Sequence, residues 1–256
     1  MRRFRSFASF KFLMNGFFMA EESGYVEYAR LAVEEFDSSS EERRNMLVDA
    51  IDDFEVKKVL DVGCGAGQQL LPFAERKGSL CVGVDIGEEV GSVGYSLFQR
   101  SGLEGKGVFL RALGEDLPFS DASFDVVICR VALPYMDNRK TIAEIGRVLR
   151  DGGRFFLKIH APAFYVWMLK KRLPMFSLKQ IAYPIICLTN GCLHSMLGKQ
   201  PRGAFWRGKE VYQTKRFLIK ELVKNNMRIV RNLADTNIAS PSFLIEKVIS
   251  KTNPSG

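Results

Sequence analysis

The stretch Val59–Gln68, with the sequence VLDVGCGAGQ, limits the fold of this chain more than any other feature. An apolar run rich in valine stops at three glycines placed at every second position, Gly63, Gly65 and Gly67, and a helical pattern follows at once. Glycine has no Cβ atom, so such a turn can adopt positive φ and let a ligand approach its backbone closely. Free backbone N–H groups at the start of the next helix would face the same ligand. The stretch predicts either a site for a nucleotide-like ligand or a glycine turn that only joins strand to helix.

A second buried strand is expected at Leu80–Asp85, and it ends in a carboxylate 18 residues beyond Gly67. In α/β units that bind nucleosides, an acid at the carboxyl end of the second strand accepts hydrogen bonds from both ribose hydroxyls. The plainer alternative is that Asp85 caps a helix that begins near Glu88. We expect Asp85 to bind a ribose, because this acid and the glycine turn occur together.

The rest of the chain predicts alternating strands and helices. Helices are expected at 24–36 and after the Ser38–Glu42 stretch, which supplies capping residues. Further strands are expected at 107–112, 124–129 and 154–159, with an amphipathic helix at Asp137–Arg150 that ends at Gly152 and Gly153. Such alternation predicts an α/β fold with a doubly wound, mostly parallel sheet, in which ligands bind outside the carboxyl ends of the strands.

Four segments carry a family resemblance: VLDVGCGAG (59–67), VGVD (82–85), EDLPFSDASFDVVIC (115–129) and EIGRVLRDGGRFFLKI (144–159). By their order and spacing the chain resembles a class I S-adenosylmethionine-dependent methyltransferase of the small-molecule type, the group that includes ubiquinone and menaquinone biosynthesis methyltransferases. Its turn is G-x-G-x-G, whereas a dinucleotide-binding Rossmann domain would show G-x-G-x-x-G. The resemblance covers roughly residues 55–160. It implies a Rossmann-like sheet of seven strands, the last two an antiparallel pair at 227–233 and 243–248, and methyl transfer from S-adenosylmethionine.

The resemblance also implies which residues bind S-adenosylmethionine. The glycines would admit the methionine part with support from Asp61, and Asp85 would bind the ribose. Ile86 would lie against the adenine, Gly114 and Glu115 would lie at its edge, and Cys129 and Arg130 would face the sulfonium. Relatives often carry Asp two residues before that Glu, where this chain has Leu113, so a side-chain contact to the adenine amino group is in doubt. The implied set is Asp61, Gly63, Gly65, Gly67, Asp85, Ile86, Gly114, Glu115, Cys129 and Arg130.

Two residues are candidates for a catalytic base. The sulfonium methyl group is already activated, so alignment and exclusion of water supply much of the rate, and a base is needed only if the acceptor must lose a proton. His160 directly follows the fifth expected strand, and Tyr135 follows the fourth. The alternatives are a histidine bonded to its adjacent loop and a tyrosine that only packs. The run Ala132–Tyr135 lacks the (D/N)-P-P-Y motif of nucleic-acid amino-methylating enzymes.

The basic charge of the chain is regional. The formal net charge is +8, yet residues 1–20 hold four basic residues without an acid, and 152–209 hold ten, also without an acid. In this fold an insertion after the fifth strand usually forms a lid over the acceptor, and an aromatic and basic lid at 161–212 would suit a small-molecule or lipid-like anionic acceptor, with an anionic membrane surface as a further partner. An ordinary packed lid with a solvated basic rim is the alternative.

An RNA methyltransferase is a lower-ranked alternative, since no RNA-binding module is visible and nucleic acid is not expected. A catalytically inactive S-adenosylmethionine-binding interaction protein is the other alternative.

We expect a single methyltransferase domain at 21–250, with a basic amphipathic segment at 1–20 and a flexible tail at 251–256. The first segment leaves several interpretations open: a helix on a membrane surface, a cleaved targeting segment, a plain packing helix, or a true translation start at Met19. The five cysteines show no metal-ligand spacing, so no metal site is expected and buried reduced thiols are predicted. These features favour a cytoplasmic protein, with peripheral contact at the inner membrane surface as an option.

Overall fold

The computed structural model describes residues 22–175, 178–197, 200 and 210–249. The predicted segment at 1–20 and the predicted tail at 251–256 lie outside these residues. The elements run in the order α2 (Glu22–Asp37), α3 (Glu41–Asp49), β1 (Lys58–Val62), α4 (Leu71–Lys77), β2 (Leu80–Asp85), α5 (Val90–Arg100), β3 (Gly107–Arg111), β4 (Phe124–Arg130), η1 (Leu133–Tyr135), α6 (Asn138–Val148), β5 (Leu149–Lys158), α7 (Pro162–Arg172), η2 (Leu173–Met175), α8 (Leu178–Leu197), α9 (Lys215–Lys224), β6 (Met227–Asn232) and β7 (Ser242–Lys247).

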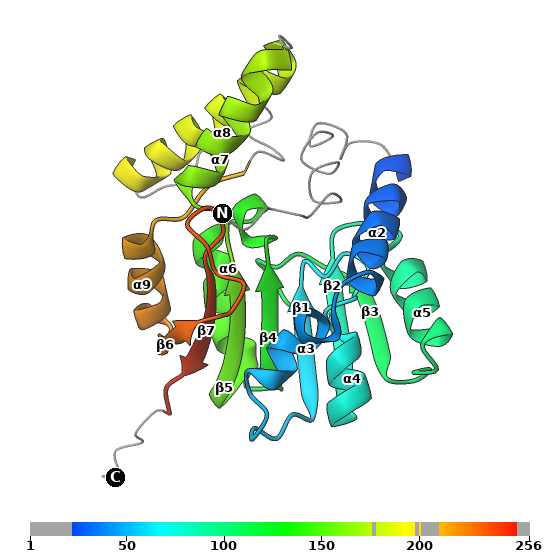
Figure 1. The fold of residues 1–256 in the computed structure, drawn as a ribbon. Coiled ribbons are helices and arrows are strands. Elements are labelled where there is room, and N and C mark those ends of the chain that lie inside the picture. The colour runs from blue at the N-terminus through cyan, green and yellow to red at the C-terminus, as the bar shows by residue number, and fades with distance from the viewer. Residues whose placement is uncertain (1–21, 176–177, 198–199, 201–209, 250–256) are drawn as a thin grey trace, which may run out of the picture.

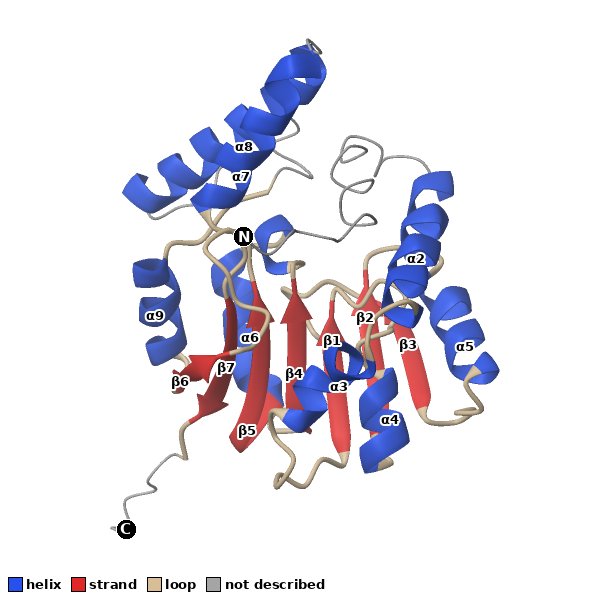
Figure 2. Ribbon diagram, in the orientation of Figure 1, coloured by secondary structure: helices blue, strands red, loops and turns tan. Residues whose placement is uncertain are grey.

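The seven strands form one sheet in the order β3-β2-β1-β4-β5-β7-β6. The five strands from β3 to β5 are parallel, and β7 pairs antiparallel with both β5 and β6 (Figure 2). Central strands such as β1 and β4 are buried over almost their whole length because helices cover both faces, which explains their continuous apolar runs. The predicted seven-stranded, mostly parallel α/β sheet is confirmed.

Each face of the sheet carries its own hydrophobic core. One core joins residues of α2, α3, α4 and α5 to one side of β1–β4, with Phe73 and Phe98 among its largest buried side chains. The other core joins α6 and α9 to the opposite side of β4, β5 and β7, around Ile142, Ile145 and Leu218. In Figure 1, α3 and α4 lie in front of the sheet and α6 behind it. This helix–sheet–helix arrangement leaves the carboxyl ends of the parallel strands as the edge at which a ligand site can form.

The boundary between α6 and β5 differs from the prediction. Helix α6 ends at Val148, and Leu149 already has extended backbone with φ −74° and ψ 131°. Leu149 is fully buried and pairs with Phe124 of β4. Burial of Leu149 in the strand therefore ends the helix earlier than the glycine pair suggested. Gly152, with φ +73°, and Gly153 lie inside β5 and do not cap the helix.

The insertion after β5 forms two helices, α7 and α8, which stand beyond the carboxyl ends of the strands (Figure 1). Their buried side chains form a third, smaller cluster: Phe164, Tyr165, Met168, Tyr183 and Cys187. Cys192 of α8 is exposed, so the prediction of buried thiols is wrong for this residue and correct for the other four cysteines. Among the described helices, none is long and apolar enough to cross a bilayer. That this insertion acts as a lid stays a prediction.

Candidate functional site

The glycine turn after β1 has the backbone that its sequence predicts. Gly63, Gly65 and Gly67 have φ values of +75°, +55° and +78°, in the left-handed region that only glycine adopts without strain. The N–H groups of Gly63 and Cys64 donate to the Val84 carbonyl at 2.8 and 3.0 Å, which ties the turn to the end of β2. The turn therefore lies at the carboxyl ends of β1 and β2.

Packing within the protein also requires two of these glycines. A Cβ atom at Gly63 would lie 2.2 Å from the Cβ of Ala132, in the loop after β4. A Cβ atom at Gly67 would lie 2.5 Å from the Phe109 ring of β3. The absence of side chains at these two positions is thus explained before any ligand is considered. Their contact with the methionine part of a cofactor stays a prediction.

Asp85 fastens the end of β2 to the glycine turn. Its two carboxylate oxygens accept hydrogen bonds from the N–H of Gly65 at 2.9 Å and from the N–H of Gly87 at 3.1 Å. Helix α5 begins at Val90 with Glu89 as its N-cap, so Asp85 does not cap that helix. Each oxygen has a further lone pair, which leaves acceptor capacity for a ribose hydroxyl.

Asp61 is a nearly buried carboxyl group at the site, with 3% of the residue exposed. No residue in the described part of the chain donates a hydrogen bond to its side chain, and burial, together with the charge of Asp85, raises its pKa to about 8, with Arg130 acting in the opposite direction. A buried acid without donors costs free energy unless it is protonated or meets a cationic partner. Asp61 can therefore pair with a cationic group of a ligand.

Gln68 follows the last glycine of the turn, and sequence reasoning did not single it out. Its side-chain oxygen is buried and has no hydrogen-bond partner within the described residues. A buried amide oxygen without a donor is unusual in a folded protein. Like Asp61, it offers an acceptor to a ligand that carries N–H groups, and no sequence motif marked it.

The loops after β2 and β3 expose two aliphatic side chains. Ile86 is 59% exposed and Leu113 is 57% exposed, and they follow neighbouring strands. Gly114 directly follows Leu113, and a Cβ atom at this position would come 2.7 Å from the sulfur of Met136. Glu115 accepts a hydrogen bond from the N–H of Asp137 at 2.7 Å, so one of its oxygens holds the start of α6.

The two residues at the end of β4 have partners within the protein. Cys129 is fully buried in the core under α6, and this burial raises the pKa of its thiol. That Cys129 and Arg130 face a sulfonium stays a prediction. Arg130 forms an ion pair with Asp235 at 2.5 Å and donates to the Ser242 hydroxyl at 3.1 Å. Its guanidinium is therefore occupied by the loop before β7 and by β7 itself.

Val131 follows Arg130 with φ +70°, which is strained for a β-branched residue. Its N–H donates to the Lys158 carbonyl of β5 at 2.7 Å. This kink turns the chain at the end of β4, so that Ala132 lies against Gly63. Backbone strain of this kind is frequent at ligand sites.

His160 lies at the end of β5 and contacts the carboxylate of Glu210. Its Nδ1 atom is 2.7 Å from Glu210 Oε2, and its ring stacks on Phe164 with ring centres 3.7 Å apart. The hydroxyls of Tyr165 and Tyr183 each donate to the same carboxylate at 2.9 Å. The sequence alternative of a bond to the adjacent loop is wrong, because the partner lies 50 residues away along the chain.

Tyr135, in η1, belongs to the same neighbourhood. Burial of its hydroxyl and the adjacent Glu210 carboxylate raise its pKa, although the residue as a whole is 42% exposed. The hydroxyl therefore faces the carboxylate while part of the ring remains open to solvent. The structure thus brings the two catalytic candidates, His160 and Tyr135, together at Glu210, a residue that sequence reasoning missed.

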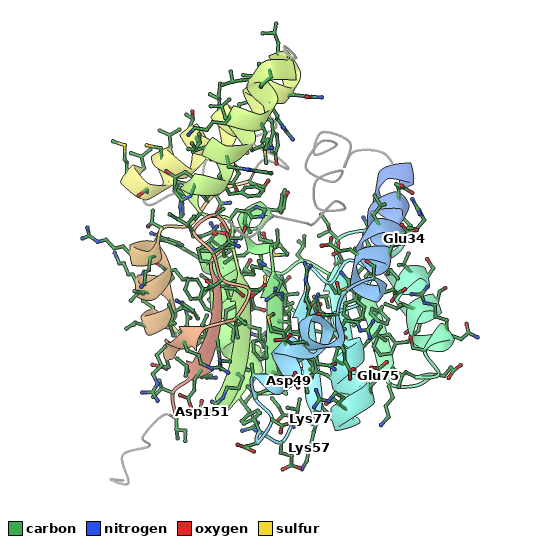
Figure 3. The ribbon with its side chains drawn as sticks, in the orientation of Figure 1. Glu34, Asp49, Lys57, Glu75, Lys77 and Asp151 are labelled. Atoms are coloured by element: carbon green, nitrogen blue, oxygen red, sulfur yellow. The ribbon has the colours of Figure 1, made fainter. Side chains whose placement is uncertain are left out.

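A separate hollow lies at the opposite end of the sheet. It is shallow, and residues 52–57 line it together with Lys77 and Gly78. Figure 3 labels Lys57 and Lys77 there, well away from α7 and α8. None of the residues that line it belongs to the glycine turn, so this hollow is not the candidate site.

The shared domain of known methyltransferases matches the central part of this chain. A family model described as "Methyltransferase domain" matches residues 60–157. YcgJ of Bacillus subtilis, described as an uncharacterized methyltransferase, is 41% identical over 104 residues, 40% of this chain and 40% of that protein. O-methyltransferase rstn1 of Aspergillus nomiae is 35% identical over 99 residues, 38% of this chain and 44% of that protein. The chain spans about two fifths of the length of these relatives.

Solved structures extend the likeness from the domain to the fold. The crystal structure of YcgJ superposes with a TM-score of 0.53 at 21% identity and covers 81% of this chain and 96% of that one. A geranyl diphosphate C-methyltransferase of Streptomyces coelicolor A3(2) gives a TM-score of 0.58 at 12% identity and covers 87% of this chain and 84% of that one. The narrower resemblance to ubiquinone and menaquinone methyltransferases stays a prediction. Residues 60–157 thus match a methyltransferase domain, and the chain has the fold of solved S-adenosylmethionine-dependent methyltransferases.

Proposed function

We propose that the chain binds S-adenosylmethionine at the carboxyl ends of β1, β2 and β3 and transfers its methyl group to an acceptor held under α7 and α8. The observation that carries the cofactor assignment is the unpaired, buried Asp61, because the cofactor bears an ammonium and a sulfonium group. The buried oxygen of Gln68 supports the same assignment. Asp61 and Gln68 lie on either side of the glycine turn, and Asp85, whose oxygens keep further lone pairs, ends the neighbouring strand at the same edge of the sheet.

The proposed contacts with the ribose and the adenine come from residues at the end of β2 and in the loops after β2 and β3. Asp85 would accept the ribose hydroxyls with its second lone pairs, and the exposed Ile86 and Leu113 would lie against the faces or edge of the adenine. Gly114 and the backbone beside Glu115 would meet the adenine edge. Leu113 offers only an apolar contact, so the adenine amino group would depend on backbone acceptors here.

When bound, S-adenosylmethionine supplies a methyl group that its sulfonium activates. The residues of the chain then have to hold the acceptor lone pair in line with that methyl group and exclude water. Such alignment contributes up to about 7–11 kcal/mol in favourable cases. Methyl transfer of this kind therefore requires neither a metal ion nor a nucleophilic side chain of the protein.

The acceptor is proposed to be a small, anionic and partly apolar molecule of lipid-like character. The described lid combines aromatic side chains with the exposed Lys170 and Lys171 at the end of α7. Geranyl diphosphate, named with the Streptomyces structure, is a molecule of this chemistry. The family match at 60–157 ends before α7 and α8, so the acceptor would depend on residues outside the matched domain.

An anionic membrane surface is proposed as the place where such an acceptor is met. Helix α8 carries exposed residues at alternating spacings of four and three, which we call the α8 stripe, and contains no acid. The α8 stripe consists of Leu178, Ala182, Ile185, Thr189, Cys192 and Met196. An uncharged helix face beside basic residues suits the boundary between lipid headgroups and acyl chains.

Calorimetric titration of the full chain with S-adenosylhomocysteine tests the cofactor assignment. We expect Asp85→Ala to weaken binding at least tenfold, because the ribose loses its acceptor and the turn loses its bond to the carboxylate. Thermal denaturation of the variant measures how much of the loss comes from the fold. Unchanged affinity in Asp85→Ala would overturn the ribose role.

Transfer of a labelled methyl group to fractionated lipid and metabolite extracts tests catalysis. A labelled product in the lipid or small-molecule fraction is expected. Cofactor binding without any labelled product would favour the inactive interaction protein. Label in RNA, together with salt-dependent retention of tRNA, would favour the RNA methyltransferase.

Sedimentation with vesicles of phosphatidylcholine and phosphatidylglycerol tests the membrane surface. We expect the full chain to sediment with these vesicles. The double variant Ile185→Glu, Met196→Glu should no longer sediment with them, because two negative charges would lie in the α8 stripe. Val230→Glu, at an exposed position of β6, is the matched control and should bind normally. Absence of binding by the unmodified chain would contradict the membrane proposal and leave methyl transfer standing.

A further inference from the structure

Glu210 is a buried carboxylate that gathers donors from three elements. It is 2% exposed and accepts hydrogen bonds from Tyr165 of α7 and Tyr183 of α8, while its Oε2 lies 2.7 Å from Nδ1 of His160. Burial alone would raise its pKa, but these contacts, that of His160 foremost, lower it overall. Glu210 is the first acid after Asp151 in the sequence. The structure thus places one ionised carboxylate where the lid meets the sheet.

This carboxylate fixes the proton position on His160. An ionised carboxylate only accepts, so Nδ1 of His160 must carry the hydrogen of their 2.7 Å contact. In the neutral imidazole, Nε2 then keeps its lone pair. No group among the described residues bonds to Nε2, and stacking on Phe164 holds the plane of the ring. His160 is therefore oriented as a proton acceptor with an open position.

The location of His160 agrees with an acceptor site. It lies two residues beyond the end of β5, at the same edge of the sheet as the glycine turn, with 8% of the residue exposed. The N–H groups of Ile159 and Ala161 donate to the carbonyls of Pro241 and Ala239, which fixes the backbone on both sides of the ring. Tyr135 and the lid tyrosines surround the carboxylate and exclude water from it.

We infer that His160, oriented by Glu210, is a general base that removes the proton of a hydroxyl acceptor, so that the proposed methyl transfer is an O-methylation. The acceptor O–H bond breaks and its proton passes to Nε2, while an oxygen lone pair forms the new bond to the methyl carbon. The carbon–sulfur bond breaks and its electron pair stays on sulfur, which gives S-adenosylhomocysteine, the methylated acceptor and an imidazolium paired with Glu210. The proton then leaves to solvent. His160 is the catalytic residue and Glu210 the positioning residue, and the inference rests on the proposed function.

The tautomer of His160 can be measured without any acceptor. The full chain has only two histidines, so nitrogen-15 NMR of labelled histidine resolves both, and His194→Gln assigns them. We expect neutral His160 to carry its proton on Nδ1 in the unmodified chain and to lose this preference in Glu210→Leu. A dominant Nε2–H tautomer in the unmodified chain would overturn the inference.

Methyl transfer to the acceptor fraction tests the catalytic role. We expect His160→Asn to lower kcat by about 10²–10⁴-fold and to remove the acidic limb of the pH–rate profile, with affinity for S-adenosylhomocysteine within about twofold. Glu210→Gln should lower kcat in the same direction with little change in KM. His194 packs against Phe217, and His194→Gln should keep the unmodified rate.

The outcomes separate the two claims. No cofactor binding by the unmodified chain would contradict the proposed function, and the tautomer measurement would still decide whether Glu210 orients His160. Transfer by the unmodified chain at a rate that His160→Asn leaves unchanged would overturn only the base. A product methylated at carbon would likewise overturn the hydroxyl acceptor while methyl transfer stands.

Discussion

Asp61 is a buried carboxyl group to which no described residue donates a hydrogen bond. Its folded-state pKa of about 8 lies above the ordinary value of 3.8, because burial and Asp85 disfavour the ionised form. At a pH between these two pKa values, Asp61 has lost its proton in the unfolded chain and keeps it in the folded chain. The contribution of Asp61 to stability is therefore fully present below about pH 4 and is lost as the pH rises to about 8.

Replacement of this acid by its neutral isostere should stabilise the free protein at high pH. We expect Asp61→Asn to raise the free energy of unfolding at pH 8 by at least about 1 kcal/mol, since each pH unit of the window is worth about 1.4 kcal/mol. At pH 4 the difference should be close to zero. Urea denaturation at the two pH values measures it, and an equal effect at both would contradict a protonated Asp61.

Single residues also mark the limit of prediction from the sequence. The acid of β2 and the glycine turn were predicted to lie together, and the bond between Asp85 and Gly65 shows that they do. Glu210 and Gln68 were missed, because their significance depends on burial and on partners that no local pattern reveals. The partner of His160, for example, is 50 residues away along the chain.

The glycine turn, as an element, is shaped by packing as much as by ligand access. The Phe109 ring occupies space left by several glycines: a Cβ atom at Gly67, Gly83 or Gly94 would come within 2.4–2.7 Å of it. Aromatic neighbours Tyr95 and Phe98 contact this ring edge-on. The turn, β3 and α5 therefore form one packed unit around Phe109.

A methyl group added to the turn should show this packing. We expect Gly67→Ala to lower the free energy of unfolding by about 2–4 kcal/mol, from left-handed strain and from the collision with Phe109. Gly78→Ala is the matched control, because Gly78 has φ +65° and no atom within 4 Å of its Cβ position, so it should show only the strain. Equal losses in the two variants, measured by chemical denaturation, would contradict the collision.

Elements with strong periodicity were predicted closely, and their boundaries less well. The third and fourth strands and the terminal antiparallel pair lie within about one residue of their predicted ranges. The predicted end of α6 is wrong because the glycine pair does not stop the helix: Leu149, three residues before Gly152, is buried and already belongs to β5. Tertiary burial overrode a local signal there.

The whole molecule divides into a sheet with two large cores and an insertion with a small one. Among the described residues, the cluster of α7 and α8 has five buried hydrophobic side chains, whereas each sheet core has more than twenty. Local unfolding is easiest where few apolar contacts hold an element. The insertion of α7 and α8 should therefore open more readily than the sheet.

Amide hydrogen exchange can test this difference. We expect amides of α8 to exchange at least tenfold faster than those of β1 and β4, through local opening of the insertion. The hydrogen bonds of Tyr165 and Tyr183 to Glu210 oppose this opening, so Glu210→Leu should accelerate exchange in α8 and leave β1 unchanged. Uniform protection across insertion and sheet would show instead that they open as one unit.

The central claim is that the glycine edge binds S-adenosylmethionine through a carboxyl group that is protonated in the free protein. Calorimetric titration with S-adenosylmethionine at pH 7, in two buffers of different ionisation enthalpy, tests it most directly. We predict binding with release of nearly one proton per site, because the cationic ligand favours ionised Asp61, and we predict weaker binding without proton release in Asp61→Asn. An unmodified chain that does not bind, or that binds without releasing a proton, would contradict this claim.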